Sequence, residues 1–113
     1  MHQRILYRDH GEEKRREEDV SLDEVRSVLR NGLVLRRYPE DNPFESYLVL
    51  GWIEGPARLG TYARGRPIHV VAADDDRRAV TWIITIYEPD PADWTDQFRW
   101  RSTWTSVKNT WRS

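Results

Sequence analysis

Between Gly32 and Pro89 the sequence holds four runs rich in β-branched and aromatic residues, joined by short connections. Such runs are typical of β-strands, and Pro, Gly, Asn and Asp gather in the segments between them. Strands joined by short links pair antiparallel, because a parallel pair needs a long crossover. We expect strands at residues 33–38, 46–54, 66–74 and 79–87.

A helix is predicted immediately before the first strand, at residues 22–31. Ser21 and Glu24 have the spacing of a capping box, in which each side chain binds a backbone N–H at the helix start. Apolar residues then follow at helical spacing and share one face. These are Val25, Val28 and Leu29. Gly32 is placed to end the helix.

The charged segment at residues 10–19 lacks an apolar face at helical spacing. Pairs such as Glu12 and Arg16 can support a helix, but each contributes only about 0.2–0.5 kcal/mol. We therefore expect this helix to form where it packs on another surface. The first nine residues are consistent with a short strand or an unstructured lead-in.

After the fourth strand, the sequence predicts a second helix. Pro89 ends the strand, since proline cannot donate to a sheet ladder, and Asp90 is placed to cap a helix that has Pro91 at its first position. Trp94 and Phe98 are four residues apart and would share one side of it. The residues that a continued helix would align are Trp100, Trp104, Val107 and Trp111.

The expected architecture is therefore α+β: an N-terminal helix, a four-stranded antiparallel sheet and a C-terminal helix, with the helices on one face of the sheet. The fourth strand carries apolar residues on both faces, which favours an interior strand with one face under the helix. We place a single domain at residues 1–101. Residues 102–113 form a tail that contains tryptophan and arginine and can extend the second helix.

Composition excludes several classes of function. The 113 residues include no cysteine, which excludes disulfides, thiolate zinc sites and a cysteine nucleophile. The three histidines lack metal-ligand spacing, and no glycine-rich phosphate loop occurs. The net charge of −1 argues against a dedicated nucleic-acid binder, which is usually basic. No apolar run approaches the roughly 20 residues of a membrane span. We expect a cytoplasmic protein without a metal or cofactor.

The C-terminal tryptophans have two interpretations. Trp100, Trp104 and Trp111 are interleaved with four basic and no acidic residues at positions 99–113. Aromatic rings among cations can stack on the bases of RNA. The same pattern suits the buried side of a docked helix or an exposed surface for a protein partner.

Six segments occur in an order that carries a family resemblance. They are residues 19–25 (DVSLDEV), 38–43 (YPEDNP), 47–51 (YLVLG), 66–71 (RPIHVV), 83–91 (IITIYEPDP) and the pair Trp94 and Phe98. Together they resemble the domain-of-unknown-function family 4258 over residues 10–101, about four-fifths of the chain.

The resemblance implies a small α+β toxin of the barnase, colicin and interferase nuclease fold. The implied activity is metal-independent cleavage of RNA, as by the mRNA interferase of a toxin–antitoxin pair. The implied partners are RNA and a cognate antitoxin, often a small zinc-finger protein. His10 and Lys14 match the histidine and the basic residue with which the family opens. Glu18 stands where the family has an arginine, so an anion replaces a cation that could bind phosphate.

Metal-independent cleavage of RNA needs an acid, a base and a cation at one phosphodiester. Histidine suits proton transfer near neutral pH, so His10 and His69 are candidates for the acid and the base. Thr85 and Tyr87 are candidates to donate hydrogen bonds to the phosphate. The candidate catalytic residues are thus His10, His69, Thr85 and Tyr87, and the candidate phosphate-binding residues are Lys14, Arg66, Arg77 and Arg78.

The fourth strand predicts where two of these side chains point. Strict alternation places Trp82, Ile84 and Ile86 on one face and Ile83, Thr85 and Tyr87 on the other. If the third and fourth strands are neighbours in a suitable register, His69 shares a face with Thr85 and Tyr87 and the three can form a site.

The alternative function is a non-catalytic protein-interaction module on the same fold, with Trp100, Trp104 and Trp111 as partner-binding residues. A histidine or tyrosine in a strand is often a core residue held by hydrogen bonds, which supports this alternative. Convergence of the candidates on one cleft would favour an enzyme. Burial of His10 and His69 in separate places would favour the interaction module.

Overall fold

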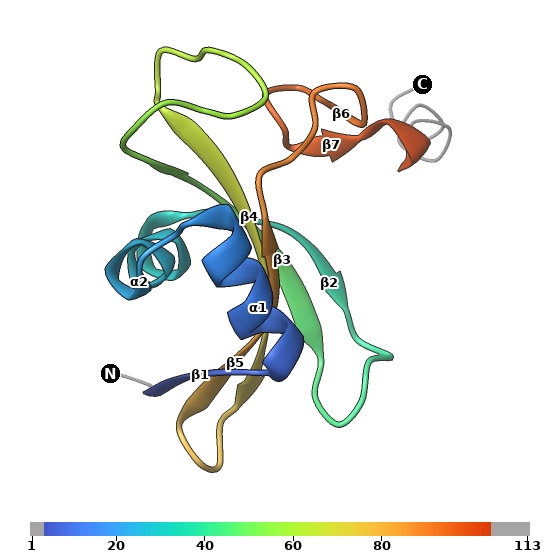
Figure 1. Ribbon diagram of the computed structural model, residues 1–113. Helices are drawn as coiled ribbons and strands as arrows, with labels where there is room; N and C mark the ends of the chain where they lie inside the picture. Colours follow the sequence, from blue (N-terminus) through green and yellow to red (C-terminus); the bar gives the residue numbers. More distant parts are fainter. Residues whose placement is uncertain (1–3, 105–113) are drawn as a thin grey trace.

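Five strands form one mixed sheet in the order β1-β5-β4-β3-β2 in the computed structural model, which describes residues 4–104 (Figure 1). The strands are β1 (Arg4–Tyr7), β2 (Leu33–Tyr38), β3 (Ser46–Ile53), β4 (Arg66–Asp75) and β5 (Val80–Tyr87). The four strands predicted from the sequence are all present, and their ends differ from the expected ones by one residue at most. β5 lies inside the sheet between β1 and β4, as its two apolar faces indicated.

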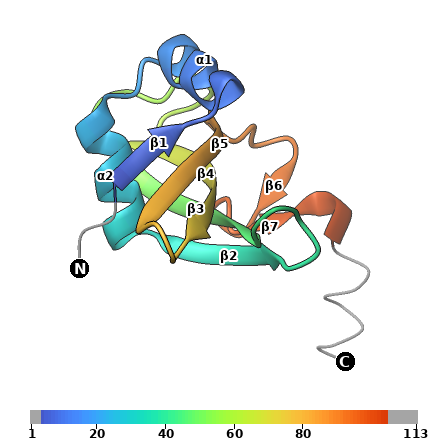
Figure 2. The same cartoon turned by 90° about the horizontal axis from the view of Figure 1, so that it is seen from below.

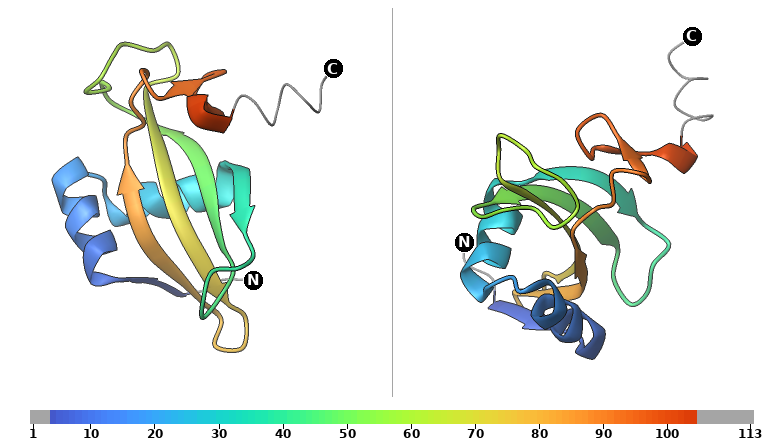
Figure 3. Two further views of the ribbon diagram at one scale, coloured as in Figure 1. Left: turned by 90° about the vertical axis from the view of Figure 1, so that its right-hand side faces the viewer. Right: turned by 45° about the horizontal axis from the view of Figure 1, so that its top comes forward.

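Two helices pack on the sheet: α2 (Leu22–Asn31) covers one face at β3 and β4, and α1 (Asp9–Glu18) lies beside β5 (Figure 3). The predicted capping box starts α2: the Glu24 N–H donates to Oγ of Ser21 over 3.0 Å, and the Ser21 N–H donates to the Glu24 carboxylate over 2.8 Å. Val25 and Val28 on this helix are buried against the sheet. Neither helix within residues 4–104 is long and apolar enough to cross a membrane.

The charged helix α1 packs through its backbone rather than through an apolar face. Gly11 is its one buried residue, and it lies directly on the main chain of β5 at Ile83. Arg15 and Glu12 form a two-point ion pair along the helix, with N–O distances of 2.8 and 2.9 Å. The sequence predicted that this helix forms where it packs on another surface, and β5 is that surface.

The expectation of a four-stranded, all-antiparallel sheet is wrong, because β1 adds a fifth strand at the edge. β1 runs parallel to β5, with Arg4 opposite Val80 and Tyr7 opposite Ile83. A parallel partner is possible here because α1, α2 and three strands separate β1 from β5 along the chain. A run of four residues is too short for its pattern to reveal this pairing.

The predicted C-terminal helix is also absent from the described residues. After Pro89 the chain forms a small hairpin of β6 (Trp94–Thr95) and β7 (Trp100–Arg101), followed by a 3₁₀ turn at Ser102–Trp104. The hairpin loop has positive φ at Asp96, Gln97 and Phe98, a conformation that excludes an α-helix. Trp111 and the rest of the tail, residues 105–113, lie outside the described residues.

Packing explains why a hairpin replaces that helix. Trp94 and Phe98 are each 6% exposed and pack on Leu48 and Leu50. The hairpin that carries them lies on the side of the sheet opposite α2 (Figure 3). This contact gives the sheet a second core and overrides the local helix signals, which are weak by comparison.

A β-bulge in β5 changes which side chains share a face. Val71 is opposite Thr85 and Ala72 is opposite Ile83, so Ile84 is an extra residue in the ladder. The prediction that side chains alternate strictly between the two faces of this strand is therefore wrong. Ile83 and Ile86 both lie in the core under the helices, whereas Thr85 and Tyr87 lie on the other face. Viewed from below, β1 and α1 lie beside β5 and the hairpin lies across the sheet from α2 (Figure 2).

Candidate functional site

His69 lies in the sheet beneath the hairpin and is completely buried. Its Nε2 is 2.9 Å from the carbonyl oxygen of Phe98, and because a carbonyl can only accept, Nε2 carries the hydrogen. Nδ1 then accepts a hydrogen bond from the Tyr87 hydroxyl over 3.3 Å. The Trp94 ring covers the imidazole at a centroid distance of 4.3 Å.

Burial sets the charge state of this imidazole. Removal from water lowers the pKa of His69 to about 4, although the hydrogen bond to the Phe98 carbonyl acts in the opposite direction. His69 is therefore neutral at pH 7. Since it is enclosed as well, it can position its neighbours but cannot contact a substrate in this conformation.

His10 is the exposed imidazole of the pair. It lies in the first turn of α1, and its Nε2 is 3.2 Å from Oγ1 of Thr85 on β5. The neighbouring Gly11 allows this approach, because a side chain at position 11 would overlap the carbonyl oxygen of Ile83. Two residues that are far apart in sequence thus form a small polar pair on the surface.

The β4–β5 register extends this pair into a row. His69 is opposite Tyr87 and Val71 is opposite Thr85, so His69, Thr85 and Tyr87 share one face of the sheet. Thr85 and Tyr87 are two residues apart on β5, a separation of roughly 7 Å. We name His10, Thr85, Tyr87 and His69 the imidazole–hydroxyl row.

The phenol of Tyr87 is held in its protonated form. Burial and the neighbouring Tyr38 raise the pKa of Tyr87 to about 12, and the positive charge of Arg101 opposes that rise. At neutral pH the Tyr87 hydroxyl therefore retains its hydrogen.

Three guanidinium groups stack on aromatic rings on the same side of the sheet. The pairs are Arg8 on Trp82 at 5.0 Å, Arg36 on Trp104 at 4.4 Å and Arg101 on Trp94 at 5.7 Å. Stacked arginines and aromatic rings are a surface type that binds single-stranded nucleic acid. Arg101 is one of the cations noted among the C-terminal tryptophans, whereas the sequence did not reveal Arg8 and Arg36, because Trp82 and Trp104 are distant from them along the chain.

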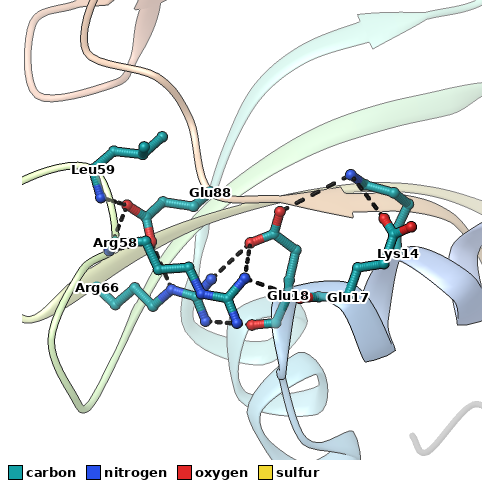
Figure 4. Close-up of polar contacts among 7 residues, drawn as sticks. All are labelled: Lys14, Glu17, Glu18, Arg58, Leu59, Arg66 and Glu88. Carbon is teal, nitrogen blue, oxygen red and sulfur yellow. Dashed lines mark hydrogen bonds and ion pairs between the residues drawn. The ribbon is translucent and has the colours of Figure 1, made fainter.

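Arg66, a predicted phosphate ligand, lies on the opposite face of the sheet and is bound by two glutamates (Figure 4). Its Nε donates to Glu88 over 2.6 Å, and its Nη2 donates to the Glu18 carboxylate over 2.7 Å. The Arg66 side chain is only 7% exposed. The structure therefore does not bring Arg66 to the imidazole–hydroxyl row.

Glu88 extends this cluster into the connection between β3 and β4. Its carboxylate accepts hydrogen bonds from the Arg58 and Leu59 N–H groups, the latter over 2.7 Å (Figure 4). Burial would raise the pKa of Glu88, but these hydrogen bonds and the one from Arg66 outweigh it and lower the pKa. We name Glu18, Arg58, Arg66 and Glu88 the buried ion cluster. It ties the end of α1 to β4, to the residue after β5 and to the connecting loop.

The remaining predicted cations lie in two other places. Lys14 is one helical turn from His10, and its Nζ is 3.5 Å from a carboxylate oxygen of Glu17 and 4.0 Å from one of Glu18. Arg77 and Arg78 occupy the turn between β4 and β5, at the far end of β5 from Tyr87, a distance of roughly 23 Å along the strand. No group of three or more His, Asp or Glu side chains within residues 4–104 is placed to hold a metal ion.

Trp100 of the hairpin packs against Trp104 in the 3₁₀ turn that follows it. Their ring centroids are 5.1 Å apart, and Trp104 is 5.4 Å from Trp94. Both residues are partly buried, and Trp104 packs against the second core. Their role in binding a partner stays a prediction.

One signal in the sequence could have revealed the buried ion cluster. Arg66 begins an apolar strand and Glu88 follows the end of the next one, so an antiparallel pairing brings these opposite charges to the same end of the sheet. Charges in such positions require partners when they are buried. By the same argument, Glu18 is a partner for the buried Arg66 rather than a residue that repels phosphate.

The fold and the row together define a small α+β domain with a mixed sheet and a polar site that extends from α1 across β5 onto the face opposite α2. The chain belongs to the family described as domain of unknown function (DUF4258), which matches residues 7–88. This confirms the family resemblance inferred from the sequence. No curated protein matches the chain significantly, and no solved structure does so either.

Proposed function

We propose that the chain is a metal-independent endoribonuclease of the toxin type, acting at the imidazole–hydroxyl row. The observation that carries the proposal is the exposed imidazole of His10, which lies 3.2 Å from Oγ1 of Thr85, a residue that shares a face of the sheet with Tyr87. The spacing of roughly 7 Å between Thr85 and Tyr87 suits one phosphodiester, with a proton acceptor at one end and a proton donor at the other.

The proposed reaction is an internal transesterification. His10 takes the proton of the ribose 2′-hydroxyl, the 2′-oxygen bonds to phosphorus, and the bond from phosphorus to the 5′-oxygen breaks. Tyr87 gives its hydroxyl proton to the departing 5′-oxygen, and the proton that His10 took returns to Tyr87 through solvent. The products are a 2′,3′-cyclic phosphate and a free 5′-hydroxyl. With a pKa of about 12, Tyr87 holds its proton at pH 7 and is still a stronger acid than the alcohol that the departing 5′-oxygen becomes.

His69 has a positioning role in this proposal. Its Nδ1 accepts the Tyr87 hydroxyl in the free protein and so fixes where the phenol lies. Two cations are available to the phosphate: Lys14 one turn from His10, and Arg101 near Tyr87. Glu17 and Glu18 partly neutralise Lys14, so Arg101 is the cation on which the proposal depends more.

The partners of such an enzyme are RNA and a cognate antitoxin, for which a small zinc-finger protein is the type that the family resemblance implies. The arginines stacked on Trp82, Trp94 and Trp104 support RNA as the substrate. An antitoxin that blocks cleavage has to cover His10, since that imidazole is the accessible one of the row.

A non-catalytic interaction module is the second candidate, and two observations favour it. His69 is enclosed, and Arg66 is bound by two carboxylates, so neither meets a substrate. The exposed apolar side chains of Leu33 and Val34 on the edge strand β2 give such a module a surface for a protein.

Inducible expression in a bacterium that lacks a partner separates the two candidates. The endoribonuclease predicts growth arrest with decay of cellular RNA, and loss of both effects in His10→Ala. Glu13→Ala, an exposed position on the same helix, is the matched control and should arrest growth like the native chain. Normal growth with soluble native protein would contradict the enzyme and support the interaction module.

A further inference from the structure

Two cavities meet at Trp52 and Arg64, at the end of the sheet where β3 leads into the loop before β4. In Figure 3 this loop and the β6–β7 hairpin lie at the same end of the molecule. One cavity, of about 500 Å³, is walled by aromatic rings of the loop and the hairpin. The other, of about 410 Å³, lies between the end of α2 and the edge of β3.

The first cavity offers aromatic surface on several sides. The rings of Trp52, Tyr62 and Phe98 contact one another edge to face, at centroid distances of 5.2 to 6.0 Å. Gln97 and Thr95 also line this cavity and supply hydrogen-bond donors and acceptors at its polar side. A planar ligand with polar groups on its edge fits this combination.

The second cavity offers positive charge. Arg64 lines both cavities and stacks on Trp52 at 5.0 Å, and Arg99 lines the second one. Within residues 4–104 neither guanidinium forms an ion pair with a carboxylate. No acidic residue lines the second cavity, so an anion placed there meets two arginines and no opposing charge.

We infer that the two cavities together bind one nucleotide unit, with its base in the aromatic cavity and its phosphate between Arg64 and Arg99. Aromatic rings stack on bases regardless of sequence, and guanidinium groups bind phosphate through paired N–H donors. Trp52, which walls both cavities, lies where the sugar would join the two parts. The site goes beyond the proposed cleavage reaction, because it shares no residue with the imidazole–hydroxyl row.

The same chemistry is present in a free nucleotide and in one residue of an RNA strand. NMR titration of the full chain, followed at the tryptophan indole N–H signals, can use three probes: 5′-AMP, adenosine and a 2′-O-methyl tetranucleotide that cannot be cleaved. The double variant Arg64→Gln/Arg99→Gln should weaken binding of 5′-AMP at least tenfold and leave adenosine binding unchanged. Tyr62→Leu should weaken the binding of 5′-AMP and adenosine alike.

Arg77→Gln/Arg78→Gln is the matched control, because it removes two exposed arginines at the far turn and should change binding less than twofold. Tetranucleotide binding at least tenfold tighter than 5′-AMP binding, with the same dependence on Arg64 and Arg99, would assign the site to RNA. Equal affinities would assign it to a free nucleotide. Absence of saturable binding, or binding that Arg64→Gln/Arg99→Gln leaves unchanged, would overturn the inference.

The outcome is independent of the cleavage proposal. His10→Ala should retain full binding of 5′-AMP, because His10 lines neither cavity. Binding of 5′-AMP without cleavage of RNA would therefore refute the endoribonuclease and support this site. Cleavage of RNA without binding of 5′-AMP would support the endoribonuclease and refute this site.

Discussion

Gly11 lies against the main-chain carbonyl of Ile83, so closely that a Cβ at position 11 would overlap that oxygen. This contact seats α1 on β5 beside the β-bulge, and it brings His10 to Thr85. A helix without an apolar face is thereby held by backbone contact, and one end of the imidazole–hydroxyl row depends on that contact.

Gly11→Ala should destabilise the protein although alanine is the better helix former. Alanine gains about 1 kcal/mol in helix propensity, but the overlap with Ile83 requires α1 to move, and overpacking costs about 1–3 kcal/mol. Urea unfolding should show a lower midpoint, and NMR should show the His10 ring signals shifted. Glu13→Ala on the exposed side should change the free energy of unfolding by less than about 0.5 kcal/mol. A stabilised Gly11→Ala variant would contradict the close contact.

Arg66→Met should be among the most destabilising substitutions in the chain. It removes the cation between Glu18 and Glu88 and leaves buried carboxylates without that partner, which costs about 3–5 kcal/mol in the free energy of unfolding. Adding Glu88→Gln to Arg66→Met should cost less than the sum of the single effects, because the stranded charge is then removed.

The control for this prediction is Arg58→Met. The Arg58 side chain is 49% exposed and lies 3.6 Å from Glu18, so its loss should cost about 1 kcal/mol or less. Equal effects of Arg58→Met and Arg66→Met in urea unfolding would show that the cluster does not depend on the buried guanidinium.

His69 should make the protein lose stability in acid. Its pKa is about 4 in the folded protein against 6.5 ordinarily, so the unfolded chain binds more protons between these values. The contribution of neutral His69 to the free energy of unfolding is complete above pH 6.5 and falls by roughly 3 kcal/mol as the pH decreases to 4. The difference in unfolding free energy between the native chain and His69→Gln should therefore shrink over this range. A constant difference would show that His69 titrates normally.

Short sequence patterns predicted the helix α2 and the strands β2 to β5. The capping box of Ser21 and Glu24 gave the start of α2, and the β-branched runs gave β2 to β5. His69, Thr85 and Tyr87 share a face, as expected if the two strands are neighbours in a suitable register, and the register with His69 opposite Tyr87 meets that condition.

The features that the sequence did not predict depend on contacts between distant segments. β1 pairs with a strand more than 70 residues away, and the hairpin exists because Trp94 and Phe98 cover the sheet. The bulge at Ile84 could not be predicted from the residue types of β5, because neighbouring isoleucines suit either face of the strand. Arg66 was assigned to phosphate for the same reason: its partners Glu18 and Glu88 lie 48 and 22 residues away.

Cleavage of RNA by the purified full chain in EDTA, with the ends of the products identified, tests the imidazole–hydroxyl row most directly. We expect 2′,3′-cyclic phosphate and 5′-hydroxyl ends, and a loss of about 10²–10⁴-fold in rate for His10→Ala but not for Glu13→Ala. Cleavage that His10→Ala leaves unchanged, or no cleavage by the native chain, would contradict an endoribonuclease acting at this row.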